Sequence, residues 1–249
     1  MPSQRMPSTG DAKFPTTRWT LIARARSADE AVARKALNEV CAQYHYPLYC
    51  FIRRSGLNHH DSEDALHDFF AKLLRLDVFA GVVQERGRLR GLLITALRRF
   101  VVSWHRDQPH RQREVSADAP FSGDEDETRY RQEQFIEEET PERLFERKWG
   151  HEMLVRVVAR LAANYAKKGR TPVFDALLPA LEAGGTLRGG DAPVIAAKLG
   201  ITENALRATL FRMLTEYREI LESEVFQTVE SRTDVADEIA HLHSVFRRN

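Results

Sequence analysis

Hydrophobic residues recur along this chain every three or four positions, the spacing that places them on one side of an α-helix. The clearest stripe contains Leu89, Leu92, Leu93, Ala96, Leu97, Phe100, Val101 and Trp104. Residues 29–55 carry a stripe of Leu37, Val40, Cys41, Tyr44, Leu48 and Phe51, with Pro47 inside it as a predicted kink. After Gly56 a third stripe contains Ala65, Leu66, Phe69, Phe70, Leu73 and Leu74. With a shorter helix over about 17–27, the pattern predicts an all-α fold.

Residues 191–221 have the pattern of two helices joined by a glycine turn. Asp191 suits a helix start, where its carboxylate can accept free amides, and Gly200 permits a left-handed turn. Ala196 is small where the helices must cross, and Ile201 fills the space between them. The second helix begins at about Thr202 and directs inward Leu206, Leu210, Met213, Leu214, Tyr217 and Leu221. This is the layout of a helix-turn-helix, which reads the DNA major groove.

The outward side of that second helix carries Asn204, Arg207, Ala208, Phe211, Arg212 and Thr215. An exposed phenylalanine between two arginines is unusual on a plain surface helix. It suits a groove reader, because arginine takes guanine or phosphate and an apolar ring meets a thymine methyl group. The alternative is a helical hairpin that only packs. Farther on, a stripe of Val235, Ile239, Leu242 and Phe246 predicts an added C-terminal helix, either packed on its own domain or acting as a regulatory arm.

The formal net charge of +1 conceals two strongly charged segments. Residues 86–113 hold eight arginines and one acid, whereas residues 114–146 hold twelve acids and three arginines. The acidic segment has few apolar residues, so it predicts a flexible linker over 114–147. The expected organisation is a disordered N-terminus at 1–13, helical domains at 14–113 and 148–230, and a helical extension at 231–249.

Composition narrows the function classes. The chain has no long apolar run, which predicts a soluble cytoplasmic protein without a membrane span or signal peptide. Its two cysteines, Cys41 and Cys50, are too few for a disulfide framework and are expected to be reduced. His60, Asp64 and His67 have helical spacing suited to a metal, but no fourth ligand is evident. Without a Gly-rich phosphate loop or a nucleophile and base pair, we expect no enzyme activity, no cofactor and no metal.

The order of these features resembles the sigma-70 superfamily of bacterial transcription initiation factors, specifically the extracytoplasmic-function (ECF) type, which has only regions 2 and 4. The matching segments are 46–54, 61–74, 87–100 and the helix-turn-helix through 221. Segments 14–22, 227–231 and 235–242 look like a subgroup common in Planctomycetes. The resemblance covers the chain except residues 1–13 and the linker. It implies a protein that binds core RNA polymerase and directs it to promoters, reading −35 and −10 elements and stabilising the opened DNA.

The resemblance also implies roles for particular residues. In region 2, a polar face that docks on core polymerase would comprise Asp61, Glu63, Asp64, His67, Asp68 and Lys72. The loop at 78–88 would capture a flipped base of the −10 element with Phe79, Gln84 and Arg86. The phosphates of that strand would contact Arg90, Arg98, Arg99, His105 and Arg106. In region 4, the −35 element would be read by Asn204, Arg207, Phe211 and Arg212, with backbone contacts from Thr202 and Thr215.

The chain also departs from the family pattern. His67 stands where the docking motif usually has glutamine, and Thr209 and Leu214 stand where many relatives have arginine. Two other classes remain open: a helix-turn-helix regulator that acts on duplex DNA without polymerase, and a helical anti-sigma or adaptor protein. The expected partners are core RNA polymerase and promoter DNA, with an anti-sigma factor as a further candidate and no membrane. The carboxylates at 61–64, which the resemblance assigns to polymerase docking, are also typical of an ordinary helix start, where the helix dipole favours acidic side chains.

Overall fold

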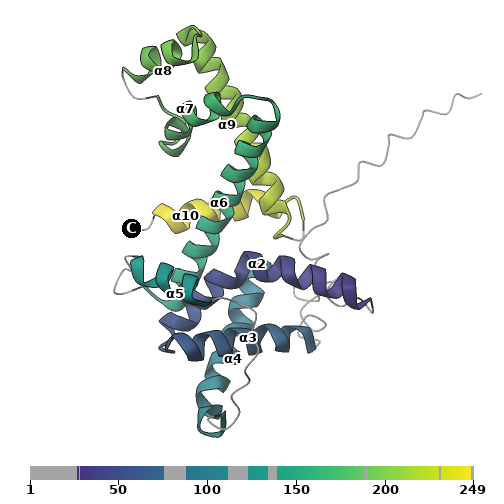
Figure 1. Ribbon diagram of the computed structural model, residues 1–249. Helices are drawn as coiled ribbons and strands as arrows, with labels where there is room; N and C mark the ends of the chain where they lie inside the picture. The colour runs from purple at the N-terminus through teal and green to yellow at the C-terminus, as the bar shows by residue number, and fades with distance from the viewer. Residues whose placement is uncertain are drawn as a thin grey trace, which may run out of the picture.

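The computed structural model describes residues 27, 29–75, 88–111, 123–133, 139–187, 190–229 and 231–247. Across these ranges every regular element is an α-helix, which confirms the all-α prediction (Figure 1). None of the helices described there is long and apolar enough to cross a membrane. The helix expected at 17–27, apart from residue 27, and the disorder expected at 1–13 lie outside the described residues.

Three of the predicted helices form the first half of the molecule. Helix α2 spans Glu30–Arg54 and begins at Asp29, whose carboxylate accepts the amides of Ala31 and Val32. Helix α3 spans His59–Arg75 and α4 spans Leu89–Arg111. Helix α3 packs against both α2 and α4, and the Phe69 and Phe100 rings meet at 5.5 Å between centroids. The described apolar stripes therefore point into a shared core, as their spacing predicts.

The structure differs from the predicted flexible linker. Helix α5 spans Gly123–Gln132 and packs on α2, and α6 spans Pro141–Lys167, so it begins inside the predicted linker. Two features explain why these helices form where a flexible linker was predicted. The acids of this segment lie against arginines, and α6 has its own buried stripe beginning with Leu144, Phe145 and Trp149.

Helix α6 connects the two halves of the molecule. It packs on α2 at one end and on α7 and α9 farther along (Figure 1). Its buried side chains include Phe145 and Trp149 in the first half and Leu161 and Tyr165 in the second. The two halves are therefore joined by a helix whose buried side chains continue one hydrophobic core through both of them, rather than by an extended segment.

The second half contains the predicted helix-turn-helix. Helix α7 spans Thr171–Glu182, α8 spans Asp191–Leu199 and α9 spans Glu203–Phe226. Gly200 ends α8 with φ of 65°, the left-handed conformation expected of the turn glycine. Thr202 caps α9 by accepting the amide of Ala205. Asp191 differs from its predicted role: Gly190 holds the capping position, and no side chain caps this helix start.

Helix α10 spans Asp234–Arg247 and corresponds to the predicted C-terminal extension. It packs on α6 and α9, crossing α6 beside its middle (Figure 1). The crossing is close because α6 has a glycine there: a Cβ atom added to Gly150 would lie 2.7 Å from Cδ1 of Leu242. Of the two roles left open by the sequence, packing on the same chain is observed, and the contacts extend to α4 through Glu238.

Candidate nucleic-acid interface

The first half of α9 separates buried apolar side chains from an exposed polar face. Leu206, Leu210 and Met213 are buried. The opposite side of the helix exposes the residues predicted to lie outward, namely Asn204, Arg207, Ala208, Phe211, Arg212 and Thr215. Phe211 is 67% exposed, which is unusual for an aromatic side chain on a packed helix. The structure therefore brings together the predicted −35 residues on one accessible surface, which we call the α9 face.

The arginines of the α9 face are anchored only weakly to their own helix. The nearest Arg207 and Glu203 side-chain atoms are 3.8 Å apart, in an exposed pair of little energetic weight. Arg212 donates to the carbonyl of Ala208 and to Oγ1 of Thr209, each at 3.3 Å. Both guanidinium groups therefore stay on the surface, where exchange of these contacts for phosphate or a base edge costs little.

The three polar residues beside these arginines make local hydrogen bonds. Thr202 holds the helix start, and the Thr215 hydroxyl donates to the carbonyl of Phe211 at 3.0 Å. Thr209 is buried and donates to the carbonyl of Ala205 at 2.7 Å. An arginine at position 209 would thus point toward the core, which gives a structural reason for threonine there.

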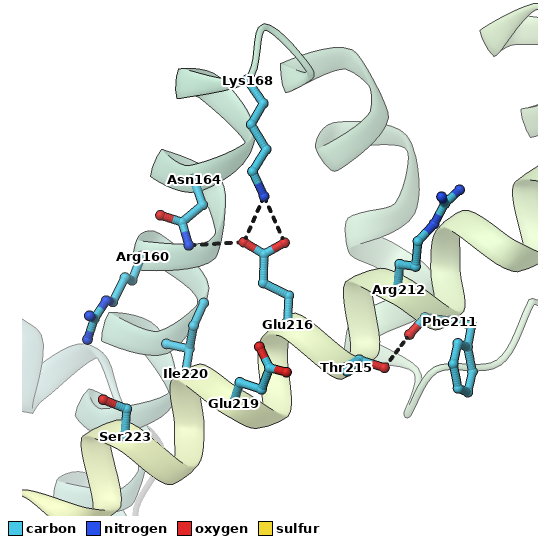
Figure 2. A pocket seen from close by; sticks show the side chains of 10 residues that line it. All are labelled: Arg160, Asn164, Lys168, Phe211, Arg212, Thr215, Glu216, Glu219, Ile220 and Ser223. Atoms are coloured by element: carbon cyan, nitrogen blue, oxygen red, sulfur yellow. Dashed lines mark hydrogen bonds and ion pairs between the residues drawn. The ribbon is translucent and has the colours of Figure 1, made fainter. Parts of the chain in front are cut away.

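A groove of about 640 Å³ lies between α6 and α9, beside the α9 face (Figure 2). Sequence reasoning missed its α6 wall, which contains Arg160, Asn164 and Lys168. Lys168 and Asn164 both contact the Glu216 carboxylate, at 3.3 and 3.0 Å. The run of Lys167, Lys168 and Arg170 in the sequence was an available signal. The groove is therefore of mixed charge: Lys168 pairs with Glu216 and Arg160 with Glu224, and Glu219 also lines it.

A second basic surface lies on α4. Arg98, Arg99, His105 and Arg106 are exposed, and Val102 between them is 67% exposed. Arg98 pairs with Glu142 of α6 at 2.6 Å, but its side chain remains 63% exposed. We call these four residues the α4 face. Their exposure makes them accessible, which contact with the phosphates of the −10 strand would require.

Arg90 differs from the predicted phosphate contact. It is 4% exposed, and its guanidinium contacts the carboxylates of Glu238 and Glu146. A phosphate cannot reach it in this arrangement. Helical spacing predicted that Arg90 lies near the basic side of α4, but α10 covers that position. Phe79, Gln84 and Arg86, the predicted base-capture residues, lie outside the described residues.

The predicted polymerase-docking residues lie along α3. Asp64, His67 and Lys72 are exposed, while Asp61, Glu63 and Asp68 are half-buried. Asn58 fixes the start of the helix, because its side chain accepts the Asp61 amide and donates to the Asp61 carboxylate. Lys72 lies 5.1 Å from the centre of the Phe100 ring. The helix thus presents carboxylates with one lysine and one histidine, a polar surface suited to a protein partner.

One cluster on α3 has the donor set of a metal site. Its members are His59, His60 and Glu63, whose possible ligand atoms lie within 4.8 Å of one another. It differs from His60, Asp64 and His67, the trio whose spacing in the sequence suits a metal but for which no metal was expected. His59 already contacts Tyr49 through Nδ1 at 2.9 Å and lies 3.6 Å from Glu63 through Nε2. These contacts explain the cluster as a consequence of the packing of α3 on α2.

The α5 contact is organised by a buried carboxylate. Glu127 accepts hydrogen bonds from Tyr49 at 2.6 Å, Arg53 at 2.9 Å and Arg131 at 2.6 Å. Burial by itself raises the pKa of Glu127, but these hydrogen bonds outweigh it and lower the pKa to about 2. Glu127 is therefore ionised at neutral pH and holds α5 against α2. Its role is structural, and sequence reasoning had treated it as part of a solvated linker.

Cys41 and Cys50 are both free and buried. Burial raises the pKa of each thiol to about 12, so neither forms a reactive thiolate at neutral pH.

Comparison of the chain with protein-family models, curated proteins and solved structures finds no match. The functional argument therefore depends on the surfaces described above: the α9 face with its flanking groove, the α4 face and the polar side of α3.

Proposed function

We propose that this chain is an ECF-type sigma factor of the sigma-70 superfamily. In the cytoplasm it binds core RNA polymerase and directs it to promoters. The observation that carries the proposal is the α9 face, where Phe211 is exposed between Arg207 and Arg212 on the second helix of a helix-turn-helix. A helix in that position enters the major groove, where these side-chain types meet bases and phosphates.

The rest of the molecule supports a two-surface initiation factor over a simple DNA-binding module. The α4 face supplies a second, separate set of cations, as contact with an opened −10 strand would need. The acidic side of α3 supplies a polar surface for polymerase. Each basic surface has few cations, so binding to promoter DNA by the free protein should be weak and only modestly salt-dependent.

The test is run-off transcription with purified bacterial core polymerase on genomic promoter fragments. Transcripts from specific start sites are expected only when the protein is added. Arg207→Ala and Arg212→Ala should each reduce them about 5- to 150-fold, since a base or phosphate contact is worth roughly 1–3 kcal/mol. Arg247→Ala is the matched control, because it removes the same charge from the exposed end of α10.

Two results would overturn the proposal. Failure to bind core polymerase, together with tight sequence-specific binding to duplex DNA alone, would indicate a conventional helix-turn-helix regulator. Binding to polymerase or to a sigma factor without any DNA-dependent effect of Arg207 and Arg212 would indicate an adaptor or anti-sigma protein.

A further inference from the structure

Glu238 is a fully buried carboxylate on the C-terminal helix. It contacts two arginines from the start of α4: Arg90 through Nε at 2.6 Å and Arg88 through Nε at 2.8 Å. Arg90 also donates through Nη2 to the second carboxylate oxygen at 3.2 Å. A charged side chain reaches zero exposure only with such compensation. The two arginines thus form an anion site that Glu238 occupies, while Glu146 of α6 contacts Arg90 from the side.

Helix α10 is held over this site by further contacts. Glu146 of α6 pairs with Arg90 on one side and with His241 of α10 on the other, the latter at 3.2 Å. Leu242 is buried against Gly150, where α6 has no side chain to keep the helices apart. The segment leading to α10 is also attached to α4, because the amide of Leu89 donates to the carbonyl of Thr228 at 3.4 Å.

The chemistry of the site matches that of a phosphate. Two guanidinium groups converging on a pair of oxygens bind carboxylate and phosphate alike. The site lies at the beginning of the helix whose later turns carry the exposed cations Arg98, Arg99 and Arg106. Arg88 remains 36% exposed, so the anion site adjoins solvent rather than lying deep in the core.

We propose that Glu238 occupies a nucleic-acid phosphate site formed by Arg88 and Arg90, and that α10 is a latch which must leave before this site can bind single-stranded DNA. The inference rests on the proposed function and adds a regulated state to it. With α10 docked, the α4 face offers only its outer cations. With α10 released, Arg88 and Arg90 extend that surface toward the start of the helix.

The first test compares Glu238→Gln with Asp237→Asn in the full-length protein. The probe is a fluorescently labelled single-stranded oligodeoxynucleotide, with binding measured by anisotropy over a range of salt concentrations. Glu238→Gln removes the charge that competes with phosphate, so at least fivefold tighter binding is expected. Its plot of log affinity against log salt should steepen by about 0.7 to 1.4, the value for one or two added phosphate contacts on a single strand, because Glu146 still pairs with Arg90. Asp237→Asn, an exposed neighbour, should change neither.

A second variant tests the latch without removing a charge. In Gly150→Cys/Leu242→Cys, the two positions touch, and the shortened side chain at 242 makes room for the new Cβ at 150. Oxidation should lock α10 onto α6 and reduce promoter-specific transcription at least tenfold. A reducing agent should restore it in the same sample. The single-cysteine variants, oxidised in the same way, control for oxidation of Cys41 and Cys50.

The outcomes separate the latch from the proposed function. If wild-type protein directs transcription but the oxidised and reduced double variant are equally active, α10 is only a structural element and the latch proposal is wrong. An unchanged salt slope in folded Glu238→Gln leads to the same conclusion. If Glu238→Gln does not fold, the reversible disulfide of Gly150→Cys/Leu242→Cys provides the test of the latch instead. If wild-type protein neither binds polymerase nor directs transcription, the proposed function itself fails.

Discussion

Burial decides the role of individual arginines in this chain. Arg90 and Arg99 are both cations on α4, but Arg90 is 4% exposed against Glu238, whereas Arg99 lies on the surface. Helical spacing shows which side of a helix a residue occupies. It does not show that a distant acid, 148 positions along the chain, covers that side. Long-range ion pairs of this kind explain why Arg90 could not be assigned from sequence.

Phe211 provides a test at this scale. Its ring is mostly exposed and its loss leaves no cavity, so Phe211→Ala should change the free energy of unfolding by less than about 0.5 kcal/mol. Promoter-specific transcription should nevertheless fall about tenfold through lost contact with a base. Urea denaturation and run-off transcription measure the two effects. A destabilised protein with normal transcription would show that Phe211 serves packing instead.

Glu127 makes stability depend on acidity. Its pKa is about 2 in the folded protein and higher in the unfolded chain, so the folded state favours the ionised form. This stabilisation is fully present above the unfolded pKa of about 4.3 and is lost as the pH falls through about 2. Unfolding followed by circular dichroism from pH 6 to pH 2 should show the loss. Glu127→Gln should be less stable at pH 6 and should lack this part of the acid dependence.

At the scale of elements, apolar spacing predicted the presence of α2, α3, α4, α9 and α10, because each has its own stripe facing the core. It failed for α5 and the start of α6. Helix α5 has ten residues, almost all polar, and its order comes from Glu127 and from the Tyr130 ring beneath Arg53, at 5.1 Å. Composition alone could not reveal partners that lie on another helix. The α6 wall of the groove was missed for the same reason.

The packing of α6 on α2 gives a prediction for these elements. Phe145 is fully buried in the first turns of α6, within the segment expected to be a linker. Phe145→Ala should lower the free energy of unfolding by about 3–5 kcal/mol, the usual cost of removing a buried aromatic ring. Val155→Ala, on the exposed side of the same helix, should cost less than about 0.5 kcal/mol. Chemical denaturation of both variants measures the difference, and equal stabilities would contradict the observed packing.

At the scale of the whole molecule, the two halves share α6 and are further joined by α10 and its ion pairs with α4. Two domains on a flexible linker would unfold independently. Here we expect one thermal transition, with equal calorimetric and van't Hoff enthalpies, because α6 cannot unfold without opening the hydrophobic core that runs through both halves. Differential scanning calorimetry tests this expectation. Two separated transitions would mean that the halves are energetically independent.

Helix α6 also acts as a rigid rod of fixed length between the two halves of the molecule. Its 27 residues, at 1.5 Å of rise each, span about 40 Å, slightly more than one turn of duplex DNA. While it remains unbroken, the α9 face and the α4 face keep a set separation and a set rotation about the helix axis. Under the proposed function, adding one base pair between two promoter elements turns one of them by about 35° relative to the other. The protein should therefore select promoters by the length of the spacer, through residues that touch no base.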